Sequence, residues 1–116
     1  DVFISSANAI TMEGFIFNVD GNGNRVAALS FGTKKNVIVA GMNKVVANLD
    51  EAHERLRAYA SPLNNIRLEK PNPCVTQGYC ADCVLPTRIC RIYQVLRRKP
   101  SLSDFTVILV GEELGF

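Results

Sequence analysis

The sequence lacks a long apolar run and contains only one histidine. Each of these features excludes some classes of protein. No run of roughly 18 apolar residues occurs, so we expect no membrane-spanning helix. The residues Asp1 to Ile4 carry no basic leader and the sequence opens without Met, so we expect a trimmed or processed cytoplasmic chain. His53 is the only histidine. Because no Ser-His-Asp or Cys-His arrangement can be assembled around it, we expect His53 to pack at a helix boundary.

Net charge is also small, at +2 from 13 basic and 11 acidic residues. The charge is uneven, however, because residues 66–100 contain seven basic and two acidic side chains, a balance of +5. This segment offers only Tyr79 and Tyr93 for stacking on bases, so we expect no nucleic-acid partner. A length of 116 residues with 47% hydrophobic content predicts one globular domain over residues 1–116.

Short β-branched runs and helical repeats predict an α/β fold. We expect strands at 2–4 and 105–110, a β-hairpin of 14–19 with 26–31, and a central strand at 36–41 buried on both faces. Asn48 and Glu51 indicate the start of a helix that ends or kinks at Pro62. Pro86 indicates a second helix. Strands alternating with helices predict a mostly parallel sheet with flanking helices.

Polar residues follow the predicted strands, where open parallel sheets bind ligands. Asn8 and Thr11 come after the first strand, and Asn43 and Lys44 come after the central strand. An amide, a hydroxyl and an ammonium group placed there would hold a carboxylate or phosphate. These four residues are therefore our predicted site for a small anionic metabolite, although ordinary loop capping explains the same pattern.

All four cysteines lie in the loop 71–90, with the spacing C-x5-C-x2-C-x6-C. Such clustering favours a shared metal site, formed by Cys74, Cys80, Cys83 and Cys90. A redox pair or disulfide of Cys80 and Cys83, or four inert thiols, are the alternatives. The spacing matches neither two zinc knuckles nor a bacterial ferredoxin, so both zinc and an iron–sulfur cluster remain open.

The predicted helix at Pro86 adds an electrostatic argument for metal binding. Its start would favour the thiolate of Cys83, and Cys90 would lie one turn into it. Four thiolates around a 2+ ion or cluster core leave a charge of about −2. Arg88 and Arg91 would offset that charge.

Three motifs in order resemble the LUD (lactate-utilisation) domain family: SANAITMEG from Ser6, NVDGNGNRVA from Asn18 and VAGMNKVV from Val39. The closing VGEELGF is similar to the end of that domain. The cysteine segment resembles a cysteine-bearing, mostly bacterial branch of the family. The resemblance implies an α/β fold related to the sugar-phosphate isomerase and CoA-transferase-like group.

The resemblance further implies a link to the oxidation of L-lactate through an iron–sulfur protein complex. We expect an accessory subunit in the oxidation of lactate or a related hydroxy acid, with iron–sulfur oxidoreductase subunits as partners. The alternative is a stand-alone enzyme that binds CoA or a sugar phosphate. Family members usually carry an upstream half that is absent here, so we expect a truncated domain. Exposed sheet surface would then favour a homo-oligomer.

Overall fold

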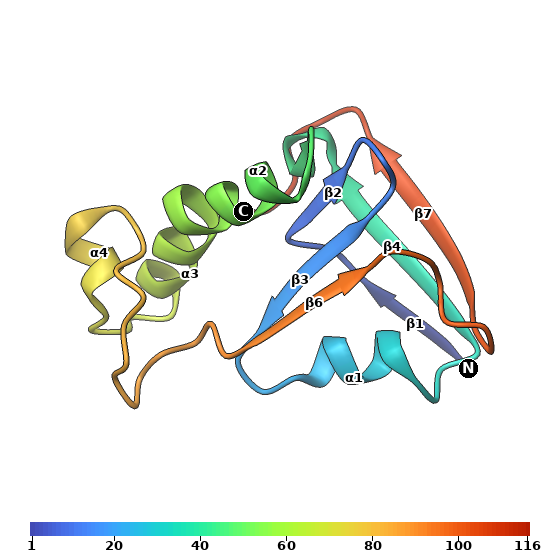
Figure 1. Cartoon of the computed structure of the whole chain (residues 1–116), viewed down its shortest axis with the longest axis horizontal. Coiled ribbons are helices and arrows are strands. Elements are labelled where there is room, and N and C mark those ends of the chain that lie inside the picture. Colours follow the sequence, from blue (N-terminus) through green and yellow to red (C-terminus); the bar gives the residue numbers. More distant parts are fainter.

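Strand β4 (Lys35–Gly41) lies at the centre of a parallel sheet, between β1 (Val2–Ser5) and β7 (Asp104–Val110). The computed structural model describes all residues, 1–116. This sheet, sheet A, confirms the predicted strands and their parallel arrangement (Figure 1). The prediction that β4 is buried on both faces was wrong. Ile38 and Ala40 are buried on one face, but Val37 and Val39 on the other are only partly covered.

A second, mixed sheet, sheet B, has the strand order β5-β2-β3-β6. Its strands are β2 (Ala9–Thr11), β3 (Ile16–Asp20), β5 (Val45–Val46) and β6 (Ile92–Leu96). Strand β2 is parallel to β5, whereas β3 is antiparallel to both β2 and β6. The β-hairpin of this protein therefore joins β2 to β3, and the predicted hairpin of 14–19 with 26–31 was wrong.

Residues 24–30 form helix α1 (Asn24–Ser30) in place of the predicted returning strand. Gly23 precedes the helix with a φ of 80°, a left-handed conformation that glycine adopts readily. The carboxylate of Asp20 accepts a hydrogen bond from the Val26 amide at 2.8 Å and so satisfies one free donor of the first turn. The turn residues 20–24 therefore lead into a helix, and Leu29 fixes it by packing into the core.

One long helical segment follows β5 and the short 3₁₀ turn η1 (Met42–Lys44). It consists of α2 (Leu49–Arg55), a π-helical turn η2 (Leu56–Ala60) and α3 (Ser61–Arg67). The predicted N-terminal cap is confirmed, because Asn48 Oδ1 accepts from the Glu51 amide at 3.0 Å. Pro62 does not end the helix. It stands in the first turn of α3, directly after the wider π turn, as expected for a residue without an amide hydrogen.

The second predicted helix, beginning at Pro86, was wrong. A short helix α4 (Pro73–Gln77) carries Cys74, and residues 78–91 form an irregular loop. The run Ile92–Leu96 becomes β6, because it pairs with β3 over five residues, from Asp20–Ile92 to Ile16–Leu96. Its β-branched and aromatic residues suit a strand, so the long-range pairing outweighs the local helix signal.

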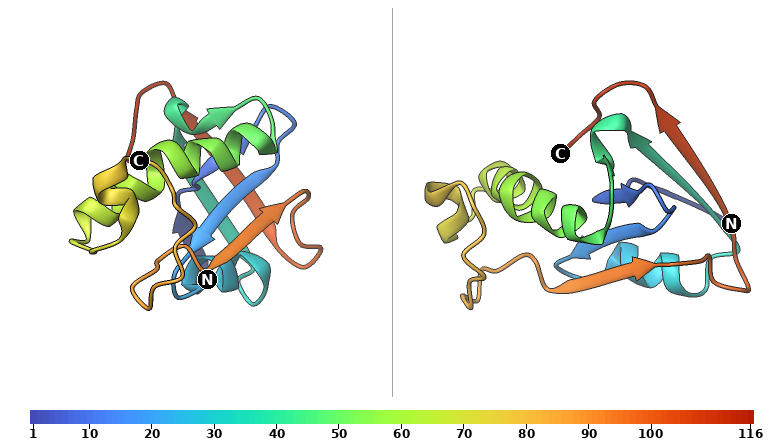
Figure 2. Two further views of the ribbon diagram at one scale, coloured as in Figure 1. Left: turned by 60° about the vertical axis from the view of Figure 1, so that its left-hand side comes forward. Right: turned by 45° about the horizontal axis from the view of Figure 1, so that its top comes forward.

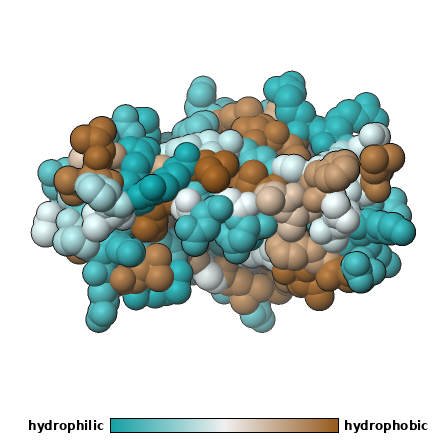
Figure 3. Space-filling model, turned by 90° about the horizontal axis from the view of Figure 1, so that it is seen from below, coloured by the Kyte–Doolittle hydropathy of each residue, from teal (hydrophilic) through white to brown (hydrophobic).

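The layers meet in two hydrophobic cores. Between the sheets, Ile10, Ile16, Leu29 and Ile38 pack together. On the other face of sheet B, Phe17 packs against Ala52, Leu56 and Ala60 of the long helix. Figure 2 shows this order of sheet A, sheet B and helix, with α4 and the cysteine loop extending beyond the sheets at one end. The α1 and β6 side has several separate apolar groups among hydrophilic residues (Figure 3). No helix combines the length and the apolar character that crossing a membrane requires.

Candidate functional site

All four cysteines line one small cavity between helix α3, helix α4 and the loop 78–91. The cavity has a volume of about 20 Å³, and Ser61, Asn65, Asn72 and Arg88 also line it. Cys74 is buried on α4, whereas Cys80, Cys83 and Cys90 are partly exposed on the loop. The structure thus brings together the four thiols that the sequence analysis proposed as ligands, although Cys90 lies on a loop rather than on the predicted helix.

Buried amides hold the cysteine loop against helix α3. Asn72 Nδ2 donates to Asn65 Oδ1 at 2.7 Å and to the carbonyl of Thr87 at 2.9 Å. The hydroxyl of Thr87 donates back to Asn72 Oδ1 at 2.6 Å. Asn65 and Asn72 are almost fully buried. Since a buried amide is costly without partners, this closed network fixes both ends of the loop relative to the helix.

The loop also bonds to the segment immediately before α3. The Cys80 amide donates to the carbonyl of Arg57 at 2.9 Å, and the hydroxyl of Tyr79 donates to the Glu54 carboxylate at 2.7 Å. Elsewhere on α2, His53 stacks on Tyr93 with ring centroids 6.1 Å apart and packs on Phe17 with centroids 4.7 Å apart. The expected packing role of His53 is thereby confirmed.

Two sulfur atoms have polar neighbours within hydrogen-bonding distance. The Asp82 amide donates to Cys80 Sγ at 3.3 Å, and Ser61 Oγ lies 3.0 Å from Cys90 Sγ. Asp82 has a φ of 49°, a left-handed backbone conformation in the Cys80–Cys83 turn. Hydrogen bonds from amides and hydroxyls stabilise thiolates and tune metal sites that use them.

The protein environment keeps two of the thiols protonated in the absence of a ligand. Burial raises the pKa of Cys74 above its usual value, and the neighbouring thiols Cys90, Cys80 and Cys83 raise it further. Burial also raises the pKa of Cys90, and the hydrogen bond with Ser61 opposes that shift. Thiolate at these positions therefore requires a nearby positive charge.

Arg88 can supply this positive charge, because it is the basic residue that lines the thiol cavity. Its guanidinium donates to Asp82 Oδ1 at 2.8 Å and to the carbonyls of Cys83 and Cys90, both at 2.6 Å. Arg88 therefore ties three parts of the loop together. Arg91, the other predicted countercharge, lines a separate groove beside the cavity.

The thiols do not form a finished site for one ion. All four cysteines are free, and no three His, Cys, Asp or Glu side chains are grouped so as to hold a metal ion. The thiols surround a shared space but do not converge on a single point. A metal would require the loop and α4 to adjust around it.

The predicted anion site has a different character. Asn8 Oδ1 accepts from the Val19 amide at 2.8 Å and from Arg25 Nη2 at 2.9 Å. Thr11 Oγ1 accepts from the Phe15 amide at 3.0 Å and closes the β2–β3 turn. Neither residue lines any of the cavities in the molecule. Both side chains therefore act in local structure.

Asn43 and Lys44 follow β4, next to the residues that follow β1 and β7. The Asn43 side chain accepts from the Leu114 amide at 3.0 Å and donates to the carbonyl of Gly115 at 3.1 Å. Lys44 is buried, and its Nζ donates to the carbonyl of Ala7 at 3.0 Å. The residues that follow β1, β4 and β7 thus come together, but they bond to one another, and neither Asn43 nor Lys44 lines a cavity. Anion binding at these four residues stays a prediction.

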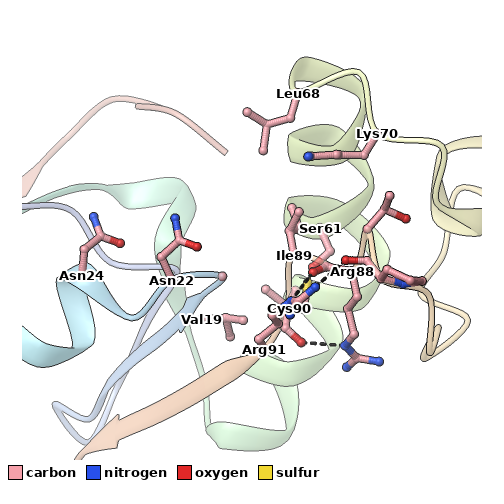
Figure 4. Close-up of a pocket in the computed structure, with 14 residues that line it drawn as sticks. Val19, Asn22, Asn24, Ser61, Leu68, Lys70, Arg88, Ile89, Cys90 and Arg91 are labelled. Carbon is pink, nitrogen blue, oxygen red and sulfur yellow. Dashed lines mark hydrogen bonds between the residues drawn. The ribbon is translucent and has the colours of Figure 1, made fainter.

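Sequence reasoning missed the polar frame of the thiol cavity, namely Ser61, Asn65 and Asn72. The signal available was weak: two adjacent asparagines inside a helical repeat, and an asparagine between two prolines. It also missed a larger groove next to the cavity, which is lined by Lys70, Arg88 and Arg91 among others (Figure 4). These residues belong to the basic segment that the charge count identified.

Comparison with known proteins gives one result. The sequence model of the LUD domain family matches residues 1–110. Neither the curated proteins nor the solved structures contain a match to the chain.

Proposed function

Because this chain belongs to the LUD domain family, we propose that it is a metal-carrying accessory subunit in the oxidation of lactate or a related hydroxy acid. One observation carries the proposal: all four cysteines of the chain line the same cavity. The four thiols come from α4 and from the fourteen-residue loop 78–91. Packing alone does not require that all of them line the same cavity. The family name supplies the link to lactate utilisation.

The proposed ligands are Cys74, Cys80, Cys83 and Cys90, with an iron–sulfur cluster as the preferred occupant and zinc as the alternative. Thiolates hold both kinds of centre. The amide of Asp82 and the hydroxyl of Ser61 already approach two of the sulfur atoms. Arg88, which lines the cavity, would offset the negative charge of the loaded site. A bound cluster would accept and donate single electrons, whereas zinc would stabilise the loop.

The geometry also indicates how the site would load. The cavity of about 20 Å³ has room for about one water molecule. Binding a cluster therefore requires α4 and the loop 78–91 to move apart. We expect loading to protect the loop against proteolysis, since a metal bound only by the folded state stabilises it.

Anaerobic purification tests the site directly. We expect iron and sulfide, or one zinc, in stoichiometric amount, with visible absorption identifying a cluster. Cys80→Ser with Cys83→Ser should abolish metal retention, whereas Val84→Ala, an exposed change in the same loop, should not. Purified chain that takes up neither iron–sulfur nor zinc, with its fold intact, would overturn the proposal of a metal site.

The accessory role needs a separate experiment. Affinity capture from cells grown on lactate should recover iron–sulfur oxidoreductase subunits, and disruption of the gene should lower lactate-dependent growth. Lactate oxidation by the isolated chain would show instead that it is an enzyme in its own right. Unchanged growth on lactate, with normal growth on other carbon sources, would contradict the role in lactate oxidation.

A further inference from the structure

A groove of about 590 Å³ lies beside the thiol cavity, between the end of β3, helix α3 and the segment 86–91. Figure 4 shows its two walls, with Asn22 and Asn24 on one and Leu68 and Lys70 on the other. Its volume is within the range of small-molecule sites. Ser61, Arg88 and Cys90 line both the groove and the thiol cavity, so the two spaces share a wall.

The charge of the groove has one sign. Lys70, Arg88 and Arg91 line it, and none of its lining residues is Asp or Glu. The Arg88 charge is partly offset outside the groove by Asp82, at 2.8 Å. Lys70 and Arg91 form no salt bridge. A concave surface lined by uncompensated cations concentrates anions.

Two hydrogen bonds to backbone carbonyls orient the Arg91 guanidinium. Its Nε donates to the carbonyl of Arg88 at 2.7 Å, and Nη2 donates to the carbonyl of Pro86. An arginine has five N–H donors, so about three of them keep no protein partner. The two carbonyls orient the planar group without neutralising it. A guanidinium prepared in this way binds a carboxylate or phosphate with little loss of side-chain freedom.

Further donors and an apolar surface complete the groove. The side chains of Lys70, Asn22 and Asn24 make no hydrogen bond within the protein, and Figure 4 shows Lys70 and Asn22 on opposite walls. Apolar contact surface comes from five residues: Val19, Leu56, Leu68, Pro86 and Ile89. Gly21 also lines the groove, where a side chain would meet the Ile89 carbonyl at 3.0 Å.

We propose that this groove binds a small organic anion, with a carboxylate or phosphate group on Arg91, the positive charge of Lys70 on the groove lining, and an apolar body against Ile89 and Pro86. The inference goes beyond the metal site, since none of the groove's charged donors is a thiol and the groove is open without a metal. Its position places the bound anion beside Cys90, on the wall shared with the thiol cavity.

The test uses three probes of equal ring size: phenyl phosphate, benzoate and neutral benzyl alcohol. Titration into isotope-labelled protein, followed by amide NMR shifts, should show both anions perturbing residues 20–24 and 86–91, with a dissociation constant on the order of 1 mM. Tighter binding of phenyl phosphate would identify a phosphate ligand, and tighter binding of benzoate a carboxylate. Benzyl alcohol should bind at least about tenfold more weakly, because it lacks the charge.

Two variants and a control locate the binding. Arg91→Gln and Lys70→Gln should each weaken the anions by about tenfold. Arg98→Gln removes an equal charge outside the groove and should leave the affinity unchanged. Lys70→Gln keeps the test valid if Arg91→Gln disturbs the loop, because the Lys70 side chain bonds to nothing in the protein. Perturbations scattered over the surface, or affinities that all three variants leave equal, would overturn the proposal.

Anion binding and metal retention are measured separately, so that the failure of one can be told from the failure of the other. The same titration applies to metal-loaded and metal-free samples, and metal content is measured on each. Anion binding without metal retention would support the anion-binding groove and contradict the metal site. Metal retention without localised anion binding would do the reverse.

Discussion

Arg25 and Asp20 form an ion pair at 2.7 Å that joins the end of β3 to the first turn of α1. The same carboxylate caps α1 at Val26, and the same guanidinium donates to Asn8 Oδ1 at 2.9 Å. The Asp20 side chain is almost fully buried. One carboxylate therefore determines that the chain turns into a helix after β3, and it links that helix to the loop after β1.

Replacing this carboxylate should destabilise the fold strongly. Asp20→Ala leaves Arg25 without its partner and the first turn of α1 without its cap, so we expect a loss of about 3 kcal/mol in the free energy of unfolding. Urea denaturation followed by circular dichroism measures the change. Glu13→Gln, at an exposed carboxylate in the β2–β3 turn, should change stability by less than about 0.5 kcal/mol. Equal effects of the two substitutions would contradict this account of α1.

Lys44 should make the free energy of unfolding depend on pH in the alkaline range. Burial, together with the smaller effects of the Arg55 and Arg25 charges, lowers its pKa from 10.5 to about 8. Between these two values the unfolded chain binds more protons than the folded protein, so the contribution of Lys44 to stability rises with pH. Relative to Lys44→Met, the wild type should gain roughly 3 kcal/mol over this interval. Denaturation curves at several pH values measure the difference, and a constant difference would refute the prediction.

Asn43 should hold the last residues of the sequence in place. Its side chain bonds the Leu114 amide and the Gly115 carbonyl, and Gly41 lies so close to Glu112 and Leu114 that a side chain would collide with them. Asn43→Ala and Gly41→Ala should therefore speed hydrogen exchange of the Leu114 amide, with a loss of about 1 kcal/mol for Asn43→Ala. Met42→Ala changes an exposed neighbour and serves as the control. Unchanged exchange at Leu114 would show that other contacts fix this segment.

The uncovered face of sheet A should drive self-association. Val2, Ile4 and Ile108 are 56%, 67% and 46% exposed, and the parallel register puts them on the same face as Val39. We expect dimers at micromolar to millimolar concentration in analytical ultracentrifugation, and Ile4→Lys should shift the protein towards the monomer.

Met12→Lys introduces the same charge at an apolar residue that is 75% exposed elsewhere, so it should leave self-association unchanged. A wild-type chain that stays monomeric throughout the concentration range would contradict the expected homo-oligomer.

Local signals in the sequence were strong enough to place several elements. The β-branched runs of β1, β4 and β7 end at polar or glycine residues, and Asn48 with Glu51 marked the beginning of α2. The signals failed where two structures suit the same residues. Residues 26–30 read as a strand, but Asp20 and the position of Leu29 in the core make them a helix. Residues 92–96 read as a helix, but pairing with β3 makes them a strand.

The sequence by itself determined the α/β class, the clustering of four thiols within twenty residues and the basic character of the surrounding segment, because composition and spacing are local properties. Only the tertiary structure decided that α4 and a loop, rather than a helix at Pro86, carry the thiols to one cavity. Only it showed that Asn43 and Lys44 bond to residues that follow other strands, and that Arg91 lines a groove. The physical reason is that these outcomes depend on which segments, distant in the sequence, pack and hydrogen-bond together once the chain folds.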